Sequence, residues 1–212
     1  MTALLVACGA LAREVIVARD RNGWDAKILA LPAGLHNSPG KIPAAVEQRV
    51  AETHERYEPV IVVYGDCGTG GELDQLLRER GWLGLSGPHC YSTFSGAPLF
   101  EQMMAAEPGT FFLTDYLVAS FDHLVIESLG LDRHPELRND YFSNYRRVVY
   151  LQQHYNRKLL ARAQLAAEAL GLPLEIRYTG TASLECEIES LLGFRSDGPQ
   201  VPESLEPIAN PI

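Results

Sequence analysis

Six short, largely apolar runs along the chain predict β-strands. They are rich in Val, Ile, Leu and Phe, and most of them stop at a glycine, a proline or a polar residue. The runs cover residues 3–7, 26–31, 59–64, 83–86, 110–114 and 174–178. Because most of them are continuously apolar rather than strictly alternating, they favour a sheet that is covered on both faces.

Segments with helical spacing of apolar residues lie between these runs. They cover residues 42–57, 71–80, 100–106 and 182–192. A longer region from Asp122 to Leu170 is predicted to be mostly helical, with a break at Pro135. Strands that alternate with helices predict an α/β fold, namely a single domain with a mainly parallel, helix-covered, Rossmann-like sheet and a long C-terminal helical region.

The composition changes near the end of the chain. Residues 194–212 contain four prolines and show no periodicity, whereas residues 1–193 carry all the predicted strands and helices. Proline interrupts regular structure, so this segment is predicted to be a Pro-rich C-terminal tail that follows one α/β domain of residues 1–193.

The charge of the chain excludes several classes of partner. Its 212 residues include 18 Lys and Arg against 27 Asp and Glu, a net charge of -9. Such a chain is a poor partner for nucleic acid or for an anionic membrane surface, because both are bound through clustered cations. No apolar run approaches the ~20 residues of a membrane span, and the apolar N-terminus lacks basic residues, so a cytoplasmic protein is expected. In that compartment the four cysteines are expected to bind metal, catalyse or pack, rather than form disulfides.

Thiols and imidazoles gather directly after the predicted strands. Cys8 follows the first strand, Cys67 the third and Cys90 the fourth. His36 follows the second strand, and His89 precedes Cys90. The carboxyl ends of parallel strands meet at one edge of a sheet, so these side chains are expected to lie close together.

Thiolate and imidazole are the ligands that zinc and iron–sulfur clusters take. We therefore predict a Zn²⁺ site at Cys8, Cys67 and Cys90, with a fourth position for His36, His89, water or substrate. A [4Fe–4S] cluster on the same three cysteines, with one iron open to substrate, is the alternative cofactor.

Two aspartates also follow predicted strands, Asp66 after the third and Asp115 after the fifth. They are predicted to orient the metal ligands, while His36 or His89 moves a proton. Two further interpretations stay open. The cysteines are small buried residues, or one of them is a metal-free nucleophile with a histidine as its base and an aspartate that orients it.

The glycine-rich segment after the third strand opens the next predicted helix. Gly65, Gly68, Thr69 and Gly70 are candidates for binding a phosphate or carboxylate of a cofactor or substrate. The segment matches neither GxxxxGK[ST] nor GxGxxG. The alternative is a tight turn in which Thr69 caps the helix and Glu72 completes a capping box.

The remaining cysteine and histidines are interpreted as structural. Cys186 is expected to pack on an amphipathic helix. Four histidines are placed on helices or at a helix break and are expected to be solvated or structurally satisfied: His54, His123, His134 and His154. The aromatic-rich run at residues 141–147 either packs between helix and sheet or lines a pocket.

Several of these motifs together resemble the DUF1638 family of uncharacterised archaeal and bacterial proteins. The resemblance spans about residues 1–192 and rests on five pieces: Ala7-Cys8-Gly9-Ala10-Leu11, Leu35-His36-Asn37, Tyr64-Gly65-Asp66-Cys67-Gly68, Pro88-His89-Cys90-Tyr91, and Pro108-Gly109-Thr110 leading to Leu113-Thr114-Asp115. Members of the family often accompany corrinoid-dependent methyl-transfer systems, so the resemblance implies a corrinoid or methyltransferase protein as a partner.

Taken together, the sequence favours a metal-dependent transferase or lyase of small-molecule metabolism, linked through the resemblance to one-carbon or methyl transfer. The alternatives are a non-catalytic accessory protein that binds a metal, a cluster or a corrinoid, and a metal-free cysteine enzyme. A small-molecule substrate and a homo-oligomer are the other expected partners.

Overall fold

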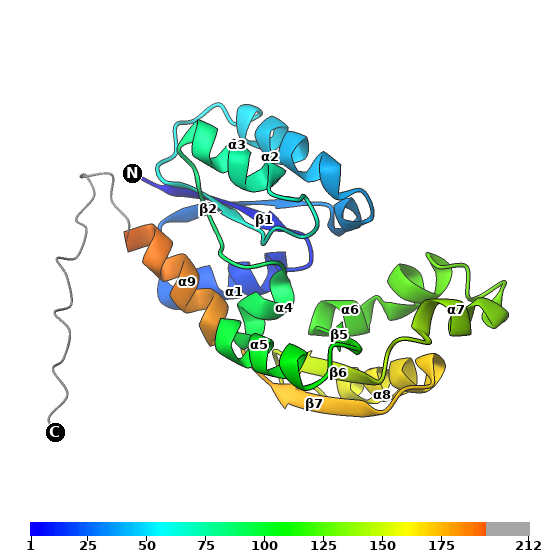
Figure 1. The fold of residues 1–212 in the computed structure, drawn as a ribbon. Coiled ribbons are helices and arrows are strands. Elements are labelled where there is room, and N and C mark those ends of the chain that lie inside the picture. The colour runs from blue at the N-terminus through cyan, green and yellow to red at the C-terminus, as the bar shows by residue number, and fades with distance from the viewer. Residues whose placement is uncertain (194–212) are drawn as a thin grey trace, which may run out of the picture.

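Two parallel sheets organise residues 1–193, the part of the chain that the computed structural model describes (Figure 1). The first sheet has the strand order β2-β1-β3-β4 and the second has the order β5-β6-β7. The strands are β1 (Ala3–Cys8), β2 (Ala26–Leu31), β3 (Val60–Val63), β4 (Leu83–Gly84), β5 (Thr110–Leu113), β6 (Arg147–Gln152) and β7 (Leu174–Tyr178). Each pair of neighbouring strands within the two sheets is parallel. The segment predicted as a Pro-rich tail, 194–212, lies outside the described residues.

Helices connect the strands and cover both sheets. The α-helices are α1 (Ala12–Asn22), α2 (Ile42–Ala51), α3 (Glu72–Arg80), α4 (Cys90–Ser95), α5 (Ala97–Ala106), α6 (Asp115–Ala119), α7 (Arg138–Phe142), α8 (Arg157–Leu170) and α9 (Ala182–Gly193). Short 3₁₀ turns occupy Ala33–Asn37 (η1), Pro39–Lys41 (η2) and Pro135–Leu137 (η4), and a π-helical turn occupies Asp122–Glu127 (η3).

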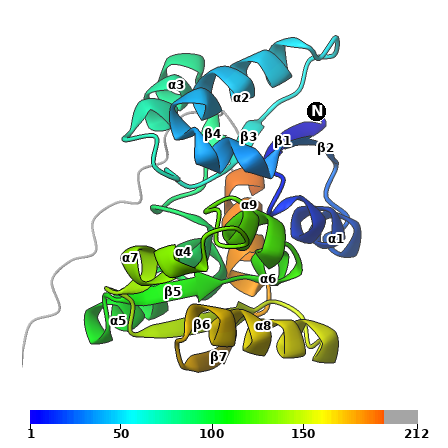
Figure 2. The same cartoon turned by 90° about the vertical axis from the view of Figure 1, so that its right-hand side faces the viewer.

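The first sheet has helices on both faces. Helices α2 and α3 cover one face, and α1 and α9 cover the other (Figures 1 and 2). Every residue of β1 is buried, because β1 lies between β2 and β3 and has helices above and below it. A continuous apolar run is the sequence that such a central strand requires.

The second sheet divides its side chains between two separate apolar clusters. Val148 and Tyr150 of β6 pack in one cluster with residues of α6, η3, α7 and α8. The alternate residues Val149 and Leu151 pack in the other, with Met103 of α5 and Tyr91 of α4. This alternation follows from the two-residue repeat of a strand, and it buries β6 on both faces.

The last helix returns to the first sheet. Leu184 and Ile188 of α9 are fully buried in the core of the first sheet, although α9 follows the last strand of the second sheet. The Glu185 carboxylate of α9 accepts hydrogen bonds from Arg21 and Asn22 at the end of α1. The described part of the chain therefore begins and ends in the half of the molecule that is built on the first sheet.

The predicted α/β fold class is confirmed, and the structure adds a second parallel sheet. All six apolar runs contain a strand, although β4 keeps only Leu83–Gly84. The prediction of a mostly helical region from Asp122 to Leu170 was wrong at β6. The run Val148–Leu151 is apolar and fully buried, and pairing with β5 and β7 decides its structure. The last helix of the predicted helical region therefore begins only at Arg157, where the Asn156 side chain caps it.

Close packing of α8 on the second sheet gives a testable prediction. Ala163, Ala166 and Ala167 are at most 2% exposed, so no space remains there for a larger side chain. Replacing Ala167 with Leu should overpack this contact and destabilise the fold by about 1–3 kcal/mol. The matched variant Ala161→Leu changes an exposed position of the same helix and should leave stability nearly unchanged. Urea unfolding of both variants checks this, and equal midpoints would contradict the packing.

Candidate functional site

A cluster of thiols and one imidazole lies where β1, β2 and β3 end. Cys8 is the last residue of β1 and is buried. Cys67 lies in the loop between β3 and α3, and Cys90 is the first residue of α4. The three cysteines pack against one apolar core. Cys90 follows β4 by a loop rather than directly, because β4 ends early at Gly84.

His36 lies in η1, which follows β2. Both of its ring nitrogens are 4.0 Å from the Cys8 Sγ. Its Nδ1 is 2.8 Å from the Ala33 carbonyl oxygen, so Nδ1 carries the proton and donates it there. The pKa of His36 is raised to about 11, mainly because the side chains of Cys67 and Cys8 hydrogen-bond to its ring. His36 therefore lies between two of the three thiols.

Cys90 and Tyr64 complete the cluster. Burial raises the pKa of the Cys90 thiol, and the negative charges of Cys67 and Cys8 raise it further. The pKa of Tyr64 is raised mainly by burial and then by its closeness to Cys8. The Tyr64 ring stacks on His36 with 6.1 Å between the ring centres. The three cysteines, His36 and Tyr64 therefore lie in one neighbourhood at this edge of the first sheet.

The loop that carries Cys67 is held in an unusual backbone shape. Cys67 has a φ of 49°, and no other non-glycine residue in the described part of the chain has a positive φ. Such a conformation costs of order 1 kcal/mol and persists only where the surroundings impose it. Here the backbone N–H groups of Asp66 and Cys67 donate to the carbonyl oxygens of Gly87 and Pro88, at 3.1 and 2.7 Å.

Asp66 fixes the other side of this loop. Its carboxylate accepts hydrogen bonds from the N–H groups of Gly68, Gly70 and Gly71 and from the Thr69 hydroxyl, at 2.6–3.4 Å. These donors hold the pKa of Asp66 below its ordinary value, the Thr69 hydroxyl most of all. The N–H groups of Gly68 and Gly70, two of the candidates for binding an anion, therefore donate to Asp66 instead. The expected capping box does not form either, because Gly71 caps α3 and Thr69 bonds to Asp66.

His89 belongs to a different environment from that of the thiols. Its ring packs against Tyr91 and Phe100, with ring centres 5.0 and 4.9 Å apart. Burial lowers the pKa of His89, so the neutral ring is favoured. The ring lines a cavity of about 590 Å³ at β5, together with Tyr91, Phe100, Met104, the segment 108–112, Tyr141, Asn144 and Tyr145. Part of the aromatic-rich run at residues 141–147 thus lines a cavity, while Phe142 is buried in the second sheet's core.

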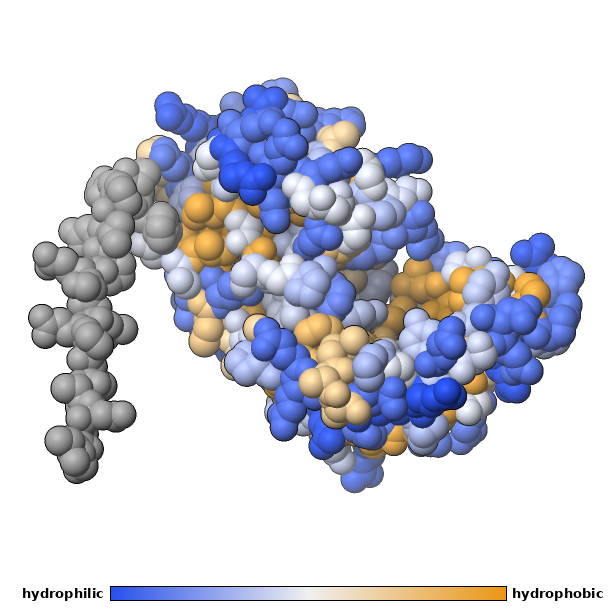
Figure 3. Space-filling model, in the orientation of Figure 1, coloured by the Kyte–Doolittle hydropathy of each residue, from blue (hydrophilic) through white to orange (hydrophobic). Residues whose placement is uncertain are grey.

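The surface is also hollowed beside this region. Figure 3 shows a hollow between the half of the molecule built on the first sheet and the arm that carries α7, with hydrophobic residues along it. Aromatic and apolar walls with few polar groups are typical of sites for small molecules.

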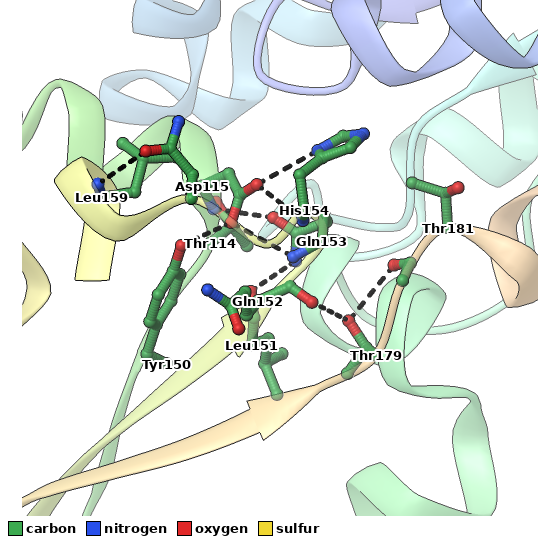
Figure 4. A network of polar contacts seen from close by, with 12 residues as sticks. Thr114, Asp115, Tyr150, Leu151, Gln152, Gln153, His154, Leu159, Thr179 and Thr181 are labelled. Atoms are coloured by element: carbon green, nitrogen blue, oxygen red, sulfur yellow. Dashed lines mark hydrogen bonds and ion pairs between the residues drawn. The ribbon is translucent and has the colours of Figure 1, made fainter.

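Asp115 lies away from the thiols, at the carboxyl end of β5, and is 2% exposed. Its Oδ2 is 3.1 Å from Nδ1 of His154, and its Oδ1 accepts a 2.6 Å hydrogen bond from the Tyr150 hydroxyl (Figure 4). The expectation that His154 lies on a helix was wrong, because it follows β6. The run Val-Val-Tyr-Leu before it is the sequence signal that predicts this strand end.

The structure places Cys186 on the exposed side of α9, so it does not pack as expected. Within residues 1–193, no three or more His, Cys, Asp or Glu side chains are arranged to hold a metal ion as they stand. In the same residues no helix is long and apolar enough to cross a membrane.

The family to which the chain belongs is the one described as "Protein of unknown function (DUF1638)", whose model matches residues 30–187. The matched stretch includes His36, Cys67, Cys90 and Asp115, whereas Cys8 precedes it. The search of curated proteins and the search of solved structures gave no match.

The backbone contact beneath Cys67 gives a second prediction. A Cβ on Gly65 would lie 2.8 Å from the backbone nitrogen of His89 and 2.9 Å from the Gly87 oxygen. Neither atom belongs to a flexible side chain, so Gly65→Ala should destabilise the fold by roughly 1–3 kcal/mol. Gly34→Ala is the control, since nothing lies within 4 Å of its added Cβ. Thermal unfolding of both variants measures the difference, and an unchanged Tm for Gly65→Ala would refute the close approach.

Glu14 in the first turn of α1 gives a prediction about pH. The residue is 4% exposed, and burial raises its pKa above the ordinary 4.5. A raised carboxyl pKa in the folded state favours folding at low pH and costs stability as the pH rises through that value. Glu14→Gln should therefore raise the Tm at pH 8 and change it little at pH 4. A larger gain at pH 4 than at pH 8 would contradict this assignment.

Proposed function

We propose that this protein is a metal-dependent transferase or lyase of small-molecule metabolism, in which the thiolates of Cys8, Cys67 and Cys90 and the imidazole of His36 hold Zn²⁺. The observation that carries the proposal is the convergence of these four side chains from four separate segments of the chain. Three thiols and an imidazole form the donor set that zinc prefers. Each cysteine side chain turns about a single bond, so binding would draw the sulfurs inward around the ion.

The construction of the Cys67 loop supports this proposal. The loop combines a strained φ at Cys67 with hydrogen bonds from its neighbours and from the 87–88 segment. Backbone strain that the surroundings impose is concentrated at functional sites. A cysteine that only filled space in the core would need no such support.

Bound zinc would act as a Lewis acid toward a substrate thiol, hydroxyl or water. The aromatic cavity at β5 and the hollow beside α7 offer apolar contact for a small organic substrate. A [4Fe–4S] cluster on the three cysteines is the other cofactor that this donor set suits. The link to corrinoid-dependent methyl transfer, with a corrinoid or methyltransferase protein as partner, is supported by the family resemblance alone.

A metal-free cysteine enzyme is the second candidate, and one observation favours it. His36 lies beside both Cys8 and Cys67, and a histidine next to a thiol is the arrangement that activates a cysteine nucleophile. In this case a single thiolate attacks the substrate, and Cys90 has only a packing role.

Metal content of the purified full chain tests the proposal. Elemental analysis after anaerobic purification should find close to one zinc per chain, or several irons together with brown colour for a cluster. Serine at position 8, 67 or 90 should each remove most of the metal, because a hydroxyl is a poor ligand for a soft site. Cys186→Ser is the matched control, since Cys186 is exposed on α9, and it should keep full occupancy.

The outcomes separate the two candidates. Full metal content in Cys67→Ser would contradict the metal proposal. No metal in any form of the protein, combined with fast alkylation of Cys67 or Cys8 by iodoacetamide that slows in His36→Gln, would establish the metal-free candidate instead. Metal loss in Cys186→Ser equal to that in the other variants would place a different fourth ligand in the site.

A further inference from the structure

A second group of polar side chains gathers in the other sheet, where β5 and β6 end. Asp115 follows β5 and His154 follows β6, so the parallel pairing of these strands brings them together. The carboxylate Oδ2 of Asp115 is 3.1 Å from Nδ1 of His154 and accepts a 2.9 Å hydrogen bond from the backbone N–H of the same residue. Figure 4 shows the network around them.

Asp115 is a buried carboxylate whose contacts are all hydrogen-bond donors. Its Oδ1 accepts from the Tyr150 hydroxyl at 2.6 Å and from the N–H of Gln153 at 3.1 Å. The backbone N–H of Asp115 in turn donates to the Gln153 side chain at 2.7 Å. A side chain that is 3% exposed and surrounded by donors is held in one position.

This carboxylate determines which nitrogen of His154 carries the proton. An ionised carboxylate only accepts, so Nδ1 must donate to it, and the neutral ring then has its lone pair on Nε2. Within residues 1–193 no hydrogen bond engages Nε2, and the His154 side chain is 38% exposed. Figure 4 shows the ring pointing away from the strands of the second sheet, toward the ribbon of the N-terminal half.

One further acidic side chain faces the pair from the other half of the molecule. Glu14 of α1 interacts electrostatically with both His154 and Asp115, and Arg13 lies beside it. From β6, the Tyr150 hydroxyl faces Asp115, and the pKa of Tyr150 is raised by burial and then by that carboxylate. Helix α1, which carries Glu14, begins four residues after Cys8. The Asp115–His154 pair therefore faces the helix that follows the first cysteine of the thiol cluster.

We propose that His154 is an acid–base catalyst and that Asp115 is the residue that positions it. Nε2 takes a proton from a hydroxyl or thiol of a small molecule, which leaves as the alkoxide or thiolate, and the Asp115 carboxylate balances the charge of the imidazolium formed. Return of that proton to the product regenerates the neutral ring. Because Asp115 and Glu14 both lie nearby, the site favours an uncharged or cationic substrate over an anion.

This step involves residues other than the proposed metal ligands and requires no metal. Its test is therefore independent of the zinc proposal. The surface pair His123 and Glu127 is a matched control, since its Nδ1 to Oε2 distance is 3.0 Å but both side chains are more than half exposed.

The first experiment examines the ring in the full chain without any substitution. Nitrogen-15 spectra should show the His154 proton on Nδ1 and a free lone pair on Nε2. Modification by diethyl pyrocarbonate, followed by mass spectrometry of the peptides, should be about tenfold faster at His154 than at His123. A proton on Nε2, or a rate no higher than that of His123, would overturn the proposal.

Variants then separate positioning from a purely structural role. Asp115→Asn should lower the modification rate at His154 at least about tenfold, because the ring changes tautomer, and Asp115→Glu should restore part of it. Glu127→Gln should leave the rate at His123 unchanged. Steady-state hydrolysis of p-nitrophenyl acetate, an uncharged probe, should be on the order of a hundredfold slower in His154→Gln. Equal hydrolysis rates in wild type and His154→Gln would overturn the catalytic role, whatever the metal content of the protein.

Discussion

The parallel pairing of the strands within residues 1–193 is the constraint on which the rest of the structure depends. Two parallel neighbours cannot be joined by a tight hairpin, so the chain must cross a face of the sheet between them. Helices α1, α2 and α3 make these crossings around the first sheet, and α8 makes the crossing from β6 to β7. As a result the central strands are buried on both faces, and the strands of each sheet end on one edge. Both candidate sites lie at such edges.

The two sheets are held together by elements that touch both of them. Helix α9 follows the second sheet but buries Leu184 and Ile188 in the core of the first. Helix α4 contacts α9 and also β6. Cys90 is the first residue of α4, so the thiol cluster extends to a helix that bridges the two halves. Any shift of one half against the other would therefore change the position of one thiol relative to Cys8 and Cys67.

Much of this arrangement could be predicted from the sequence, because local signals and tertiary structure agree. Apolar runs identified the strands of the first sheet, and residues after strand ends identified Cys8, His36 and Cys67. Strand β6 was not predicted from the sequence. Its two valines and Tyr150 are strand-forming residues, but they stand between helical segments and fell within the predicted helical region, whereas pairing with β5 and β7 imposes a strand. That single error concealed His154, since a histidine on a helix carries no such positional meaning.

Other details depend on contacts that no local pattern encodes. Asp66 follows a strand just as Asp115 does, yet the two carboxylates have different roles. Asp66 turns back into its own loop and bonds to Thr69 and Gly71, two contacts that are local in sequence. Asp115 instead bonds to Tyr150, Gln153 and His154, at least 35 residues away. Only the pairing of β5 with β6 brings these partners together.

The thiol cluster and the Asp115–His154 pair differ in how far the protein itself satisfies their polar atoms. The oxygens of Asp115 are satisfied by donors within the protein, so this group keeps its geometry unaided, and only Nε2 of His154 remains open. Thiols are weak hydrogen-bond partners, and Cys8, Cys67 and Cys90 are held in place by the backbone around them rather than by bonds to one another. Gathering three such groups beside His36 brings little stability by itself. The role proposed for the thiol cluster therefore depends on what the cluster binds or attacks, whereas the role proposed for the Asp115–His154 pair depends on the proton that the pair already holds.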